Sequence, residues 1–214
     1  MSAPVIIIGA GGHAKVVVDA LRRSGRDILG LVDNDPEKVG ATVLGVPVIG
    51  GDDAIEKHTP ADVNLAIGLG LVRQRQALFS AFKESGYAFA KVIHPAAVVA
   101  DNARIGEGAQ IMAGAIIQPD AIIGDNVIIN TRASVDHDCV IGDHVHIAPG
   151  ATLAGGVWIG EGSMIGVGAT LLENVRIGDN CIIAGGATVI GDVPANITVA
   201  GVPAKPMTSK EQDA

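Results

Sequence analysis

The stretch ASVDHDCVIGDHVHIAPGATLAGGVWIG, residues 133–160, decides the fold of this chain because an aliphatic residue returns at every sixth position. The same period extends in both directions and covers residues 93–194. An amphipathic helix would space apolar residues by three and four, and a half-buried strand would alternate them. A period of six fits neither pattern and is typical of a hexapeptide parallel β-helix. The aliphatic positions are Ile93, Val99, Ile105, Ile111, Ile117, Ile123, Ile129, Val135, Ile141, Ile147, Leu153, Ile159, Ile165, Leu171, Ile177, Ile183 and Val189.

The residue four positions after each aliphatic is small or β-branched, from Ala97 in the first hexad to Val193 in the last. Each hexad supplies a short strand and a turn, three hexads close one triangular coil, and coils stack about 4.8 Å apart. Residues eighteen apart are therefore predicted neighbours, and the narrow interior suits a chain with 2% aromatic residues. Glycines that follow the aliphatic are predicted in tight turns that need unusual φ; they are Gly106, Gly124, Gly142, Gly160, Gly166 and Gly178.

Length, composition and charge limit the class of protein. With 214 residues and 48% hydrophobic content, the chain can hold one substantial core or two modest ones. A net charge of -8 argues against a nucleic-acid partner. Cys139 and Cys181 both occupy the small position of a hexad, which predicts buried thiols. No apolar run of about eighteen residues is present, and no signal peptide is recognised, so we expect a soluble, cytoplasmic protein without a membrane span.

The chain before the hexads begins with an apolar strand over residues 5–8, followed by the glycine-rich sequence Gly9-Ala10-Gly11-Gly12-His13. A helix over about 14–24 and a second strand over 28–32 complete a β-α-β unit. In this context backbone N–H groups and a helix N-terminus can hold a phosphate, so we predict a nucleotide site. Ala14 stands where a dinucleotide fingerprint has its third glycine, which argues against NAD. Alternatively, the glycines serve only the turn.

Strands and helices continue to alternate up to about residue 90, with a short helix near 53–57, a strand at 63–67 and a helix at about 72–85. This alternation predicts a small parallel sheet. The fold class is therefore a Rossmann-like α/β domain followed by a parallel β-helix. We predict an N-terminal domain over residues 1–91, a β-helix over 92–196 and a C-terminal tail over 197–214.

Four features together resemble the NeuD/PglD/PerB group of sugar acyltransferases: the glycine-rich turn, Asp33-Asn34-Asp35 after the second strand, the hexads, and the tail Ala200-Gly201-Val202-Pro203-Ala204-Lys205. The resemblance implies a left-handed β-helix that forms homotrimers, with acetyl-CoA in the groove between neighbouring subunits. Members acetylate an amino or hydroxyl group of a sugar. In the best-known cases this is an amino group on a nucleotide-linked 4-amino-6-deoxy sugar.

The candidate catalytic pair is His137-Asp138, which interrupts the aliphatic repeat at outward-facing positions. The resemblance aligns His137 with the general base and Asp138 with the acidic residue that orients the ring, although some relatives have Glu there. Gly155 lies eighteen residues after His137 and is predicted to lie beside it on the next coil. We expect its N–H to contact the acetyl carbonyl, which the resemblance also implies. Direct transfer needs no nucleophilic Ser or Cys.

Two further histidines lie close to this pair in the sequence. The resemblance implies a role for His146 near the acetyl group and the substrate, and the alternative is a surface histidine. His144 is expected to have no functional role. The three histidines also raise the possibility of zinc, as in the γ-class carbonic anhydrases of the same fold. The resemblance to those enzymes would require two histidines five residues apart on one coil. This sequence lacks that pair, so no metal is predicted.

Ligand contacts are predicted in both halves of the chain. Substrate phosphates would meet Gly11, Gly12 and His13, with Lys15 as an additional cation; Asp33, Asn34 and Asp35 would meet the base and ribose, and Asn130 and His146 the sugar. The resemblance implies that coenzyme A meets His146, Gly155, Val167, Gly185 and Lys205. Alternatively, the glycines serve only their turns and Lys205 only the solvent. Trp158 suits a trimer contact, a cofactor contact or plain surface.

These observations favour an acetyl-CoA-dependent N-acetyltransferase acting on a nucleotide-linked 4-amino sugar of a bacterial surface polysaccharide. GDP-perosamine is favoured over a UDP-linked sugar, because Asp33 or Asp35 could accept both the N1 and N2 donors of guanine, whereas uracil offers only N3–H. Two alternatives remain. One is an O-acetyltransferase for sialic acid, and the other is a non-catalytic nucleotide-binding trimer, against which the His137-Asp138 pair argues.

Overall fold

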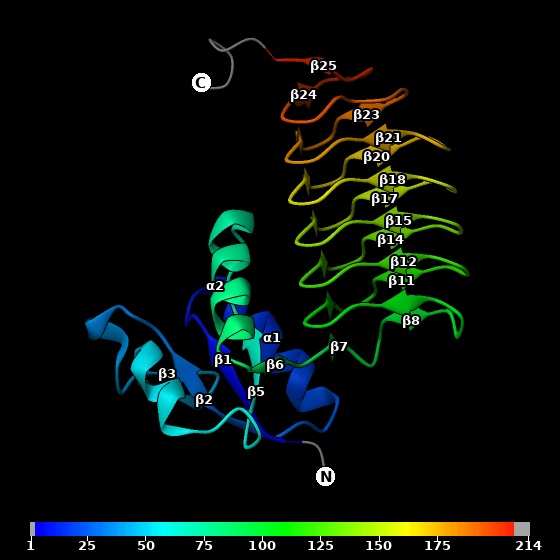
Figure 1. The fold of residues 1–214 in the computed structure, drawn as a ribbon. Helices are drawn as coiled ribbons and strands as arrows, with labels where there is room; N and C mark the ends of the chain where they lie inside the picture. The colour runs from blue at the N-terminus through cyan, green and yellow to red at the C-terminus, as the bar shows by residue number, and fades with distance from the viewer. Residues whose placement is uncertain (1–2, 208–214) are drawn as a thin grey trace. The chain divides into compact units, whose positions relative to one another are not determined.

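A computed structural model describes residues 3–207 of the chain. The chain divides into two compact units, residues 1–95 and residues 96–214. Figure 1 shows that the first unit contains both α-helices, whereas the second is a stack of short strands. The division lies between Pro95 and Ala96, close to the predicted domain boundary at residues 91–92.

The first unit is an α/β domain around a six-stranded sheet with the strand order β3-β4-β2-β1-β5-β6. All neighbouring strands are parallel except β3 and β4. The elements are β1 (Val5–Ile8), α1 (Gly12–Arg23), β2 (Ile28–Val32), η1 (Pro36–Lys38), β3 (Thr42–Val43), β4 (Val46–Gly50), η2 (Asp52–Lys57), β5 (Asn64–Ile67), α2 (Val72–Glu84), β6 (Ala88–Phe89) and β7 (Val92–Ile93).

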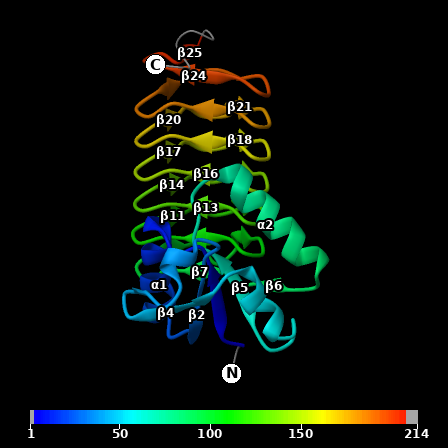
Figure 2. The same ribbon diagram turned by 90° about the vertical axis from the view of Figure 1, so that its left-hand side faces the viewer.

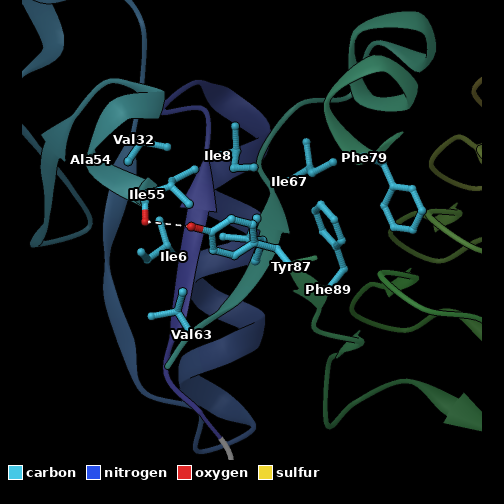
Figure 3. Packing of buried hydrophobic residues seen from close by; sticks show 11 residues of the cluster. Ile6, Ile8, Val32, Ala54, Ile55, Val63, Ile67, Phe79, Tyr87 and Phe89 are labelled. Atoms are coloured by element: carbon cyan, nitrogen blue, oxygen red, sulfur yellow. Dashed lines mark hydrogen bonds between the residues drawn. The ribbon is translucent and has the colours of Figure 1, made fainter. Parts of the chain in front are cut away.

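Strand β1 lies at the centre of this sheet, and its four residues are buried because both faces are covered. The strands that follow it in the chain pair on opposite sides: β2 on one side and β5 on the other. The strand order therefore reverses at β1, and in open α/β sheets such a switch point leaves a crevice at the carboxyl ends of the strands. Figure 3 shows the aliphatic and aromatic side chains that fill the core beside this point, including the hydroxyl of Tyr87, which donates to the carbonyl of Ile55.

The second unit is a parallel β-helix of short strands (Figure 2). Two of its three sheets have the orders β23-β20-β17-β14-β11-β8 and β21-β18-β15-β12-β9, and the third contains β24-β22-β19-β16-β13-β10. The strands are β8 (Val98–Val99), β9 (Arg104–Ile105), β10 (Gln110–Ile111), β11 (Ile116–Ile117), β12 (Ile122–Ile123), β13 (Ile128–Ile129), β14 (Ser134–Val135), β15 (Val140–Ile141), β16 (His146–Ile147), β17 (Thr152–Leu153), β18 (Trp158–Ile159), β19 (Met164–Ile165), β20 (Thr170–Leu171), β21 (Arg176–Ile177), β22 (Ile182–Ile183), β23 (Thr188–Val189), β24 (Thr198–Ala200) and β25 (Lys205–Pro206).

The predicted neighbours at a separation of eighteen residues are confirmed. Val135 pairs with Leu153, and Ile129 pairs with Ile147 on a second face. Cys139 and Cys181 are buried thiols, as predicted. The thiol of Cys139 donates to the carbonyl of Ala154 at 3.2 Å, and burial raises its pKa to about 11, so it remains protonated at neutral pH.

The glycines that follow the aliphatic position were predicted to be required by an unusual φ, and this reason is wrong. Gly106, Gly124, Gly142, Gly160, Gly166 and Gly178 are absent from the residues with left-handed φ. The left-handed residue lies two positions later in the hexad, as at Gly108 and Gly150. The first set is glycine because the coils approach closely: a Cβ on Gly142 would lie 2.9 Å from the backbone nitrogen of Glu161. Close stacking, and not φ, excludes a side chain there.

The regular eighteen-residue coil also ends earlier than the hexad pattern of the sequence predicts. Val193 pairs with Ile177, and Val199 pairs with Ile183, each at a separation of sixteen residues. Val193 therefore does not take the small position predicted for it, because the last coil is shortened. Strand β24 continues the third sheet, and β25 folds back on it in antiparallel fashion. The first residues of the predicted tail thus belong to the β-helix.

Within residues 3–207, none of the helices combines the length and apolar character required to cross a membrane.

Candidate active site

His137 and Asp138 form an exposed turn between β14 and β15. The imidazole is 62% exposed, and its Nδ1 lies 2.7 Å from Oδ2 of Asp138. Asp138 has φ of 59°, a left-handed conformation that Asp tolerates better than most residues. Because Nδ1 is engaged by the carboxylate, Nε2 is the ring nitrogen left to exchange a proton with a ligand.

A third member of this turn, Asp136, was not singled out from the sequence. Its Oδ1 accepts the backbone N–H of His137 at 2.7 Å. The hydrogen bond to Asp138 raises the pKa of His137, slight burial opposes this, and the negative charges of Asp136 and Asp138 add to the increase. The sequence contained the signal, a second carboxylate next to the histidine, because such a charge favours the imidazolium form.

Gly155 lies directly beside this histidine on the next coil. A Cβ at residue 155 would lie 2.6 Å from Cε1 and 2.7 Å from Nε2 of His137. The imidazole therefore packs over the glycine, and any side chain there would displace the ring. The coils are joined at this point, since the N–H of Gly156 donates to the carbonyl of His137 at 2.9 Å.

Asn130 and His146 form a second polar pair, with Asn130 Nδ2 3.1 Å from His146 Nε2. His146 is only 8% exposed, which excludes the alternative of a surface histidine. It lies on β16, in a different sheet from β14 and β15, which flank the His137 turn. Within a single chain, the structure does not bring this pair to His137. His144 is also buried and bonds to Asn126 at 2.9 Å.

Among the residues predicted to meet coenzyme A, Gly155 lies beside His137, whereas Val167, Gly185 and Lys205 lie away from the His137 turn. Val167 and Gly185 occupy the turns after β19 and β22, which are neighbours in one sheet. A Cβ on Gly185 would lie 3.3 Å from the carbonyl oxygen of Val167, so the two residues stack on successive coils. Lys205 is exposed on β25, which closes the same sheet. Trp158 lies between Val140 and Arg176 on a neighbouring face and is partly exposed.

The glycine-rich turn joins β1 to α1 at the switch point of the first unit. Gly9 has φ of 94° and therefore serves the turn. Gly11 and Gly12 do not have left-handed φ, and a Cβ on either would meet no atom within 4 Å. The turn alone does not explain these two glycines, whose place at the start of α1 suits the approach of a phosphate. His13 and Lys15 follow in the first turn of the helix.

Ala14 replaces the third glycine of the dinucleotide fingerprint without loss of packing. A Cβ on Gly68, at the end of β5, would lie 2.8 Å from the Cβ of Ala14. The close approach of helix and strand is thus provided by a glycine on the strand side, which the sequence of the turn alone could not reveal.

A cavity of about 330 Å³ opens at the carboxyl ends of β1 and β2. Asp52 and Gln74 belong to its lining and were not predicted. Asp52 is held by Asn34, whose Nδ2 donates to Oδ2 of Asp52 at 2.8 Å while its Oδ1 accepts the Asp52 N–H at 3.0 Å. Asp35 is not among the lining residues. The lining consists of Ile8, Gly9, Val32, Asp33, Asn34, Asp52, Leu69, Gln74 and Leu78.

Asp33 connects the cavity wall to the glycine-rich turn. Its Oδ2 accepts the N–H of Ala10 at 2.8 Å and the ammonium of Lys38 at 2.9 Å, and its Oδ1 accepts the N–H of Asp35 at 3.0 Å. Burial acts to raise the pKa of Asp33, but the backbone N–H groups and Lys38 outweigh it and lower the pKa below its ordinary value. Both carboxylate oxygens are therefore engaged by the protein itself.

Among residues 3–207, no three His, Cys, Asp or Glu side chains are grouped so that they could hold a metal ion.

Family models match both units. The model described as the PglD N-terminal domain matches residues 4–82. The model of the bacterial transferase hexapeptide matches residues 102–135, 120–155 and 156–191. No curated protein matches the sequence.

Solved structures match nearly the whole chain. PerB from Caulobacter crescentus, in complex with CoA and GDP-perosamine, is 42% identical with a TM-score of 0.91, over 97% of this chain and 99% of that chain. The acetyltransferase domain of PglB from Neisseria gonorrhoeae is 38% identical with a TM-score of 0.91, over 96% and 100%. WeeI from Acinetobacter baumannii is 30% identical with a TM-score of 0.87, over 96% and 100%.

An α/β domain joined to a hexapeptide-repeat β-helix defines an acyltransferase of the left-handed β-helix class, so the predicted fold and enzyme class are confirmed. Within that class, the chain belongs to the NeuD/PglD/PerB group of sugar acyltransferases.

Proposed function

We propose that this protein transfers an acetyl group from acetyl-CoA to the 4-amino group of a nucleotide-linked 4-amino-6-deoxy sugar. The observation that carries the proposal is the His137 turn. Its imidazole is exposed, is anchored through Nδ1 by Asp138 and rests on Gly155. A neutral imidazole with a free nitrogen and a raised pKa suits the removal of a proton from an amine.

In the proposed reaction, the sugar amine attacks the thioester carbonyl, and a C–N bond forms. Nε2 of His137 takes one proton from the nitrogen, while Asp138 stabilises the resulting imidazolium through Nδ1–H. The N–H of Gly155 is the proposed donor to the oxyanion. When the intermediate collapses, the C–S bond breaks, and the imidazolium returns its proton to the CoA thiolate. No acyl-enzyme forms.

The cavity at the switch point is the proposed nucleotide site. Gly11, Gly12 and His13 would meet the phosphates at the start of α1, where N–H groups and the helix dipole favour anions. Asn34 would meet the ribose or base. GDP-perosamine is the favoured substrate, because PerB, at 42% identity, is described in complex with it. Because the Asp33 carboxylate already accepts three hydrogen bonds and that of Asp52 accepts one, from Asn34, Asp52 in the cavity wall is the better candidate for guanine N1–H and N2–H.

We further propose a homotrimer. His137 and the Asn130–His146 pair lie on different sides of one β-helix, so a site that uses both must be completed by a neighbouring copy. Acetyl-CoA would then run along the turns that carry Val167 and Gly185 and reach Lys205 with its phosphates. Light scattering should report about three times the chain mass of 21.6 kDa, and a monomer would contradict the shared site.

The test is thiol release from acetyl-CoA with a panel of acceptors: GDP- and UDP-linked 4-amino sugars, CMP-sialic acid and free sialic acid. Turnover of a 4-amino sugar supports the proposal and identifies the nucleotide. Turnover only with a sialic acid would establish O-acetylation instead, and no turnover with any acceptor would favour a non-catalytic nucleotide-binding trimer. With the first outcome, we propose a role in surface polysaccharide synthesis in the cytoplasm.

A further inference from the structure

We propose that Lys38 neutralises Asp33 at the edge of the nucleotide cavity, and that this ion pair allows a nucleoside diphosphate to bind beside a carboxylate that shapes the glycine-rich turn. The inference rests on the proposed function, because it assumes that the cavity takes a nucleotide. It gives Lys38 a positioning and charge-balancing role that is separate from the chemistry at His137.

The first step is the structural role of Asp33. Its carboxylate accepts N–H groups from Ala10 in the glycine-rich turn and from Asp35 after β2. The bond from Ala10 joins the ends of the neighbouring strands β1 and β2 and orients the peptide of Ala10 toward Asp33, whereas the bond from Asp35 is local to the turn after β2. The N–H groups at the start of α1 are then held in one orientation for a ligand. An acceptor with two oxygens is required at this position.

The second step is the charge that this acceptor brings. Asp33 and Asp52 both line the cavity, and the side chain of Asp33 is only 13% exposed, so solvent screens its charge incompletely. A diphosphate adds negative charges to the same small space. Like charges a few ångströms apart in a partly buried site repel each other, and this repulsion would weaken binding.

Lys38 supplies the compensating charge. Its ammonium lies 2.9 Å from Oδ2 of Asp33, the oxygen that also accepts the N–H of Ala10. The second acidic neighbour, Asp35, lies at 3.8 Å. Lys38 occupies the last position of η1, which Asp35 caps by accepting the N–H of Glu37. The short helix thus places the cation against the cavity wall.

An alternative is an ordinary surface ion pair that only holds η1 in place, since Lys38 is 41% exposed. The two roles differ in what they predict for ligands. A charge-balancing lysine affects ligands with phosphates and leaves an uncharged nucleoside unaffected. A lysine that only supports η1 would affect both ligands equally, through the shape of the cavity.

The experiment compares the affinity for GDP with that for guanosine by calorimetry, and uses UDP and uridine if GDP does not bind. Lys38→Met should weaken diphosphate binding by about three- to tenfold and leave nucleoside binding unchanged. Lys38→Arg should retain the wild-type affinity. Lys57→Met is the matched control, because Lys57 is an exposed lysine of η2 outside the cavity lining and its loss changes the net charge equally.

A second arm protects the test from a folding defect. Because the proposed effect is one of charge, the loss of diphosphate affinity in Lys38→Met should shrink as the salt concentration rises, whereas a loss caused by a change in the shape of the cavity would persist. Unchanged GDP affinity in Lys38→Met, or equal losses for GDP and guanosine, would overturn the inference while leaving the nucleotide site intact. If the wild type binds neither GDP nor UDP, the proposed nucleotide site is itself wrong, and the inference fails with it.

Discussion

The two units place their polar residues by different rules. In the β-helix, a separation of eighteen residues places His137 over Gly155 and joins Asp125 to Glu107, because the coils before the shortened last one have the same length. In the α/β unit, Asn34 and Asp52 are also eighteen residues apart and bond to each other. No repeat in that region predicts the contact, which depends instead on β2 and β4 pairing in the sheet.

The comparison shows that a sequence repeat predicts which residues contact each other, whereas the sequence of an α/β unit predicts only its helices and strands. A contact in the first kind of structure follows from counting, and in the second it follows from strand order. The proposed functions are divided between the same two units. Acyl transfer is assigned to a turn of the β-helix, and nucleotide recognition to the crevice of the α/β unit. The predictions below test whether the two functions separate in this way.

The largest effect is expected at His137. His137→Asn should lower kcat by about 100- to 10,000-fold, because no group then takes the proton from the attacking amine. The affinity for the nucleotide should not change, since the proposed nucleotide contacts lie in the other unit. Steady-state kinetics and calorimetry measure the two quantities. Retained turnover would show that the base is misassigned, and a parallel loss of nucleotide affinity would break the separation of the two functions.

The next effect tests the stacking of coils. Gly155→Ala should lower kcat by about 10- to 100-fold, because the added methyl would lie 2.6 Å from the imidazole and push His137 out of place. Gly155 does not have left-handed φ, so the substitution adds no backbone strain. Gly191→Ala is the control, since its φ is also not left-handed and its Cβ would meet no atom within 4 Å. Equal kcat in both variants would refute the packing of His137 on Gly155.

A smaller effect is expected from Asp138→Asn. The base is active when neutral, so the rate should rise with pH through the pKa of His137, which Asp138 raises. Without the carboxylate, that pKa falls toward its ordinary value, and the midpoint of the pH–rate profile should move to lower pH. The plateau should also fall, by about tenfold, because the ring is less firmly oriented. An unmoved midpoint would mean that Asp138 does not act on the titrating group.

The sequence predicted much of the fold because both patterns are local. The strands Val5–Ile8 and Ile28–Val32 have the predicted bounds, and the hexads predict which residues stack. The site residues that the sequence did not predict come together only through tertiary packing. Asp52 and Gln74 enter the cavity from elements after β4 and β5, and Gly68 replaces a glycine expected at Ala14.

The role of the hexad glycines could not be predicted either, because the period shows where a glycine occurs but not whether φ or contact requires it. The shortened last coil was hidden for a related reason. Val193 fits the sequence pattern of the repeat. It nevertheless pairs with Ile177, because the last coil is two residues shorter than the eighteen of the other coils.

The smallest effect separates the two kinds of glycine in the β-helix. Gly142→Ala adds a methyl 2.9 Å from the backbone of Glu161, where neither coil can yield, and should cost about 2 kcal/mol of unfolding free energy. Gly150→Ala meets no atom within 4 Å but must keep φ of 69°, and should cost about 1 kcal/mol. Gly150→Asn should cost less than Gly150→Ala, because Asn tolerates left-handed φ, whereas Gly142→Asn should be no better than Gly142→Ala. Urea unfolding at one protein concentration measures all four variants. If Asn were to rescue position 142 instead, φ and not coil contact would be the constraint there, and the interpretation drawn first from the sequence would be restored.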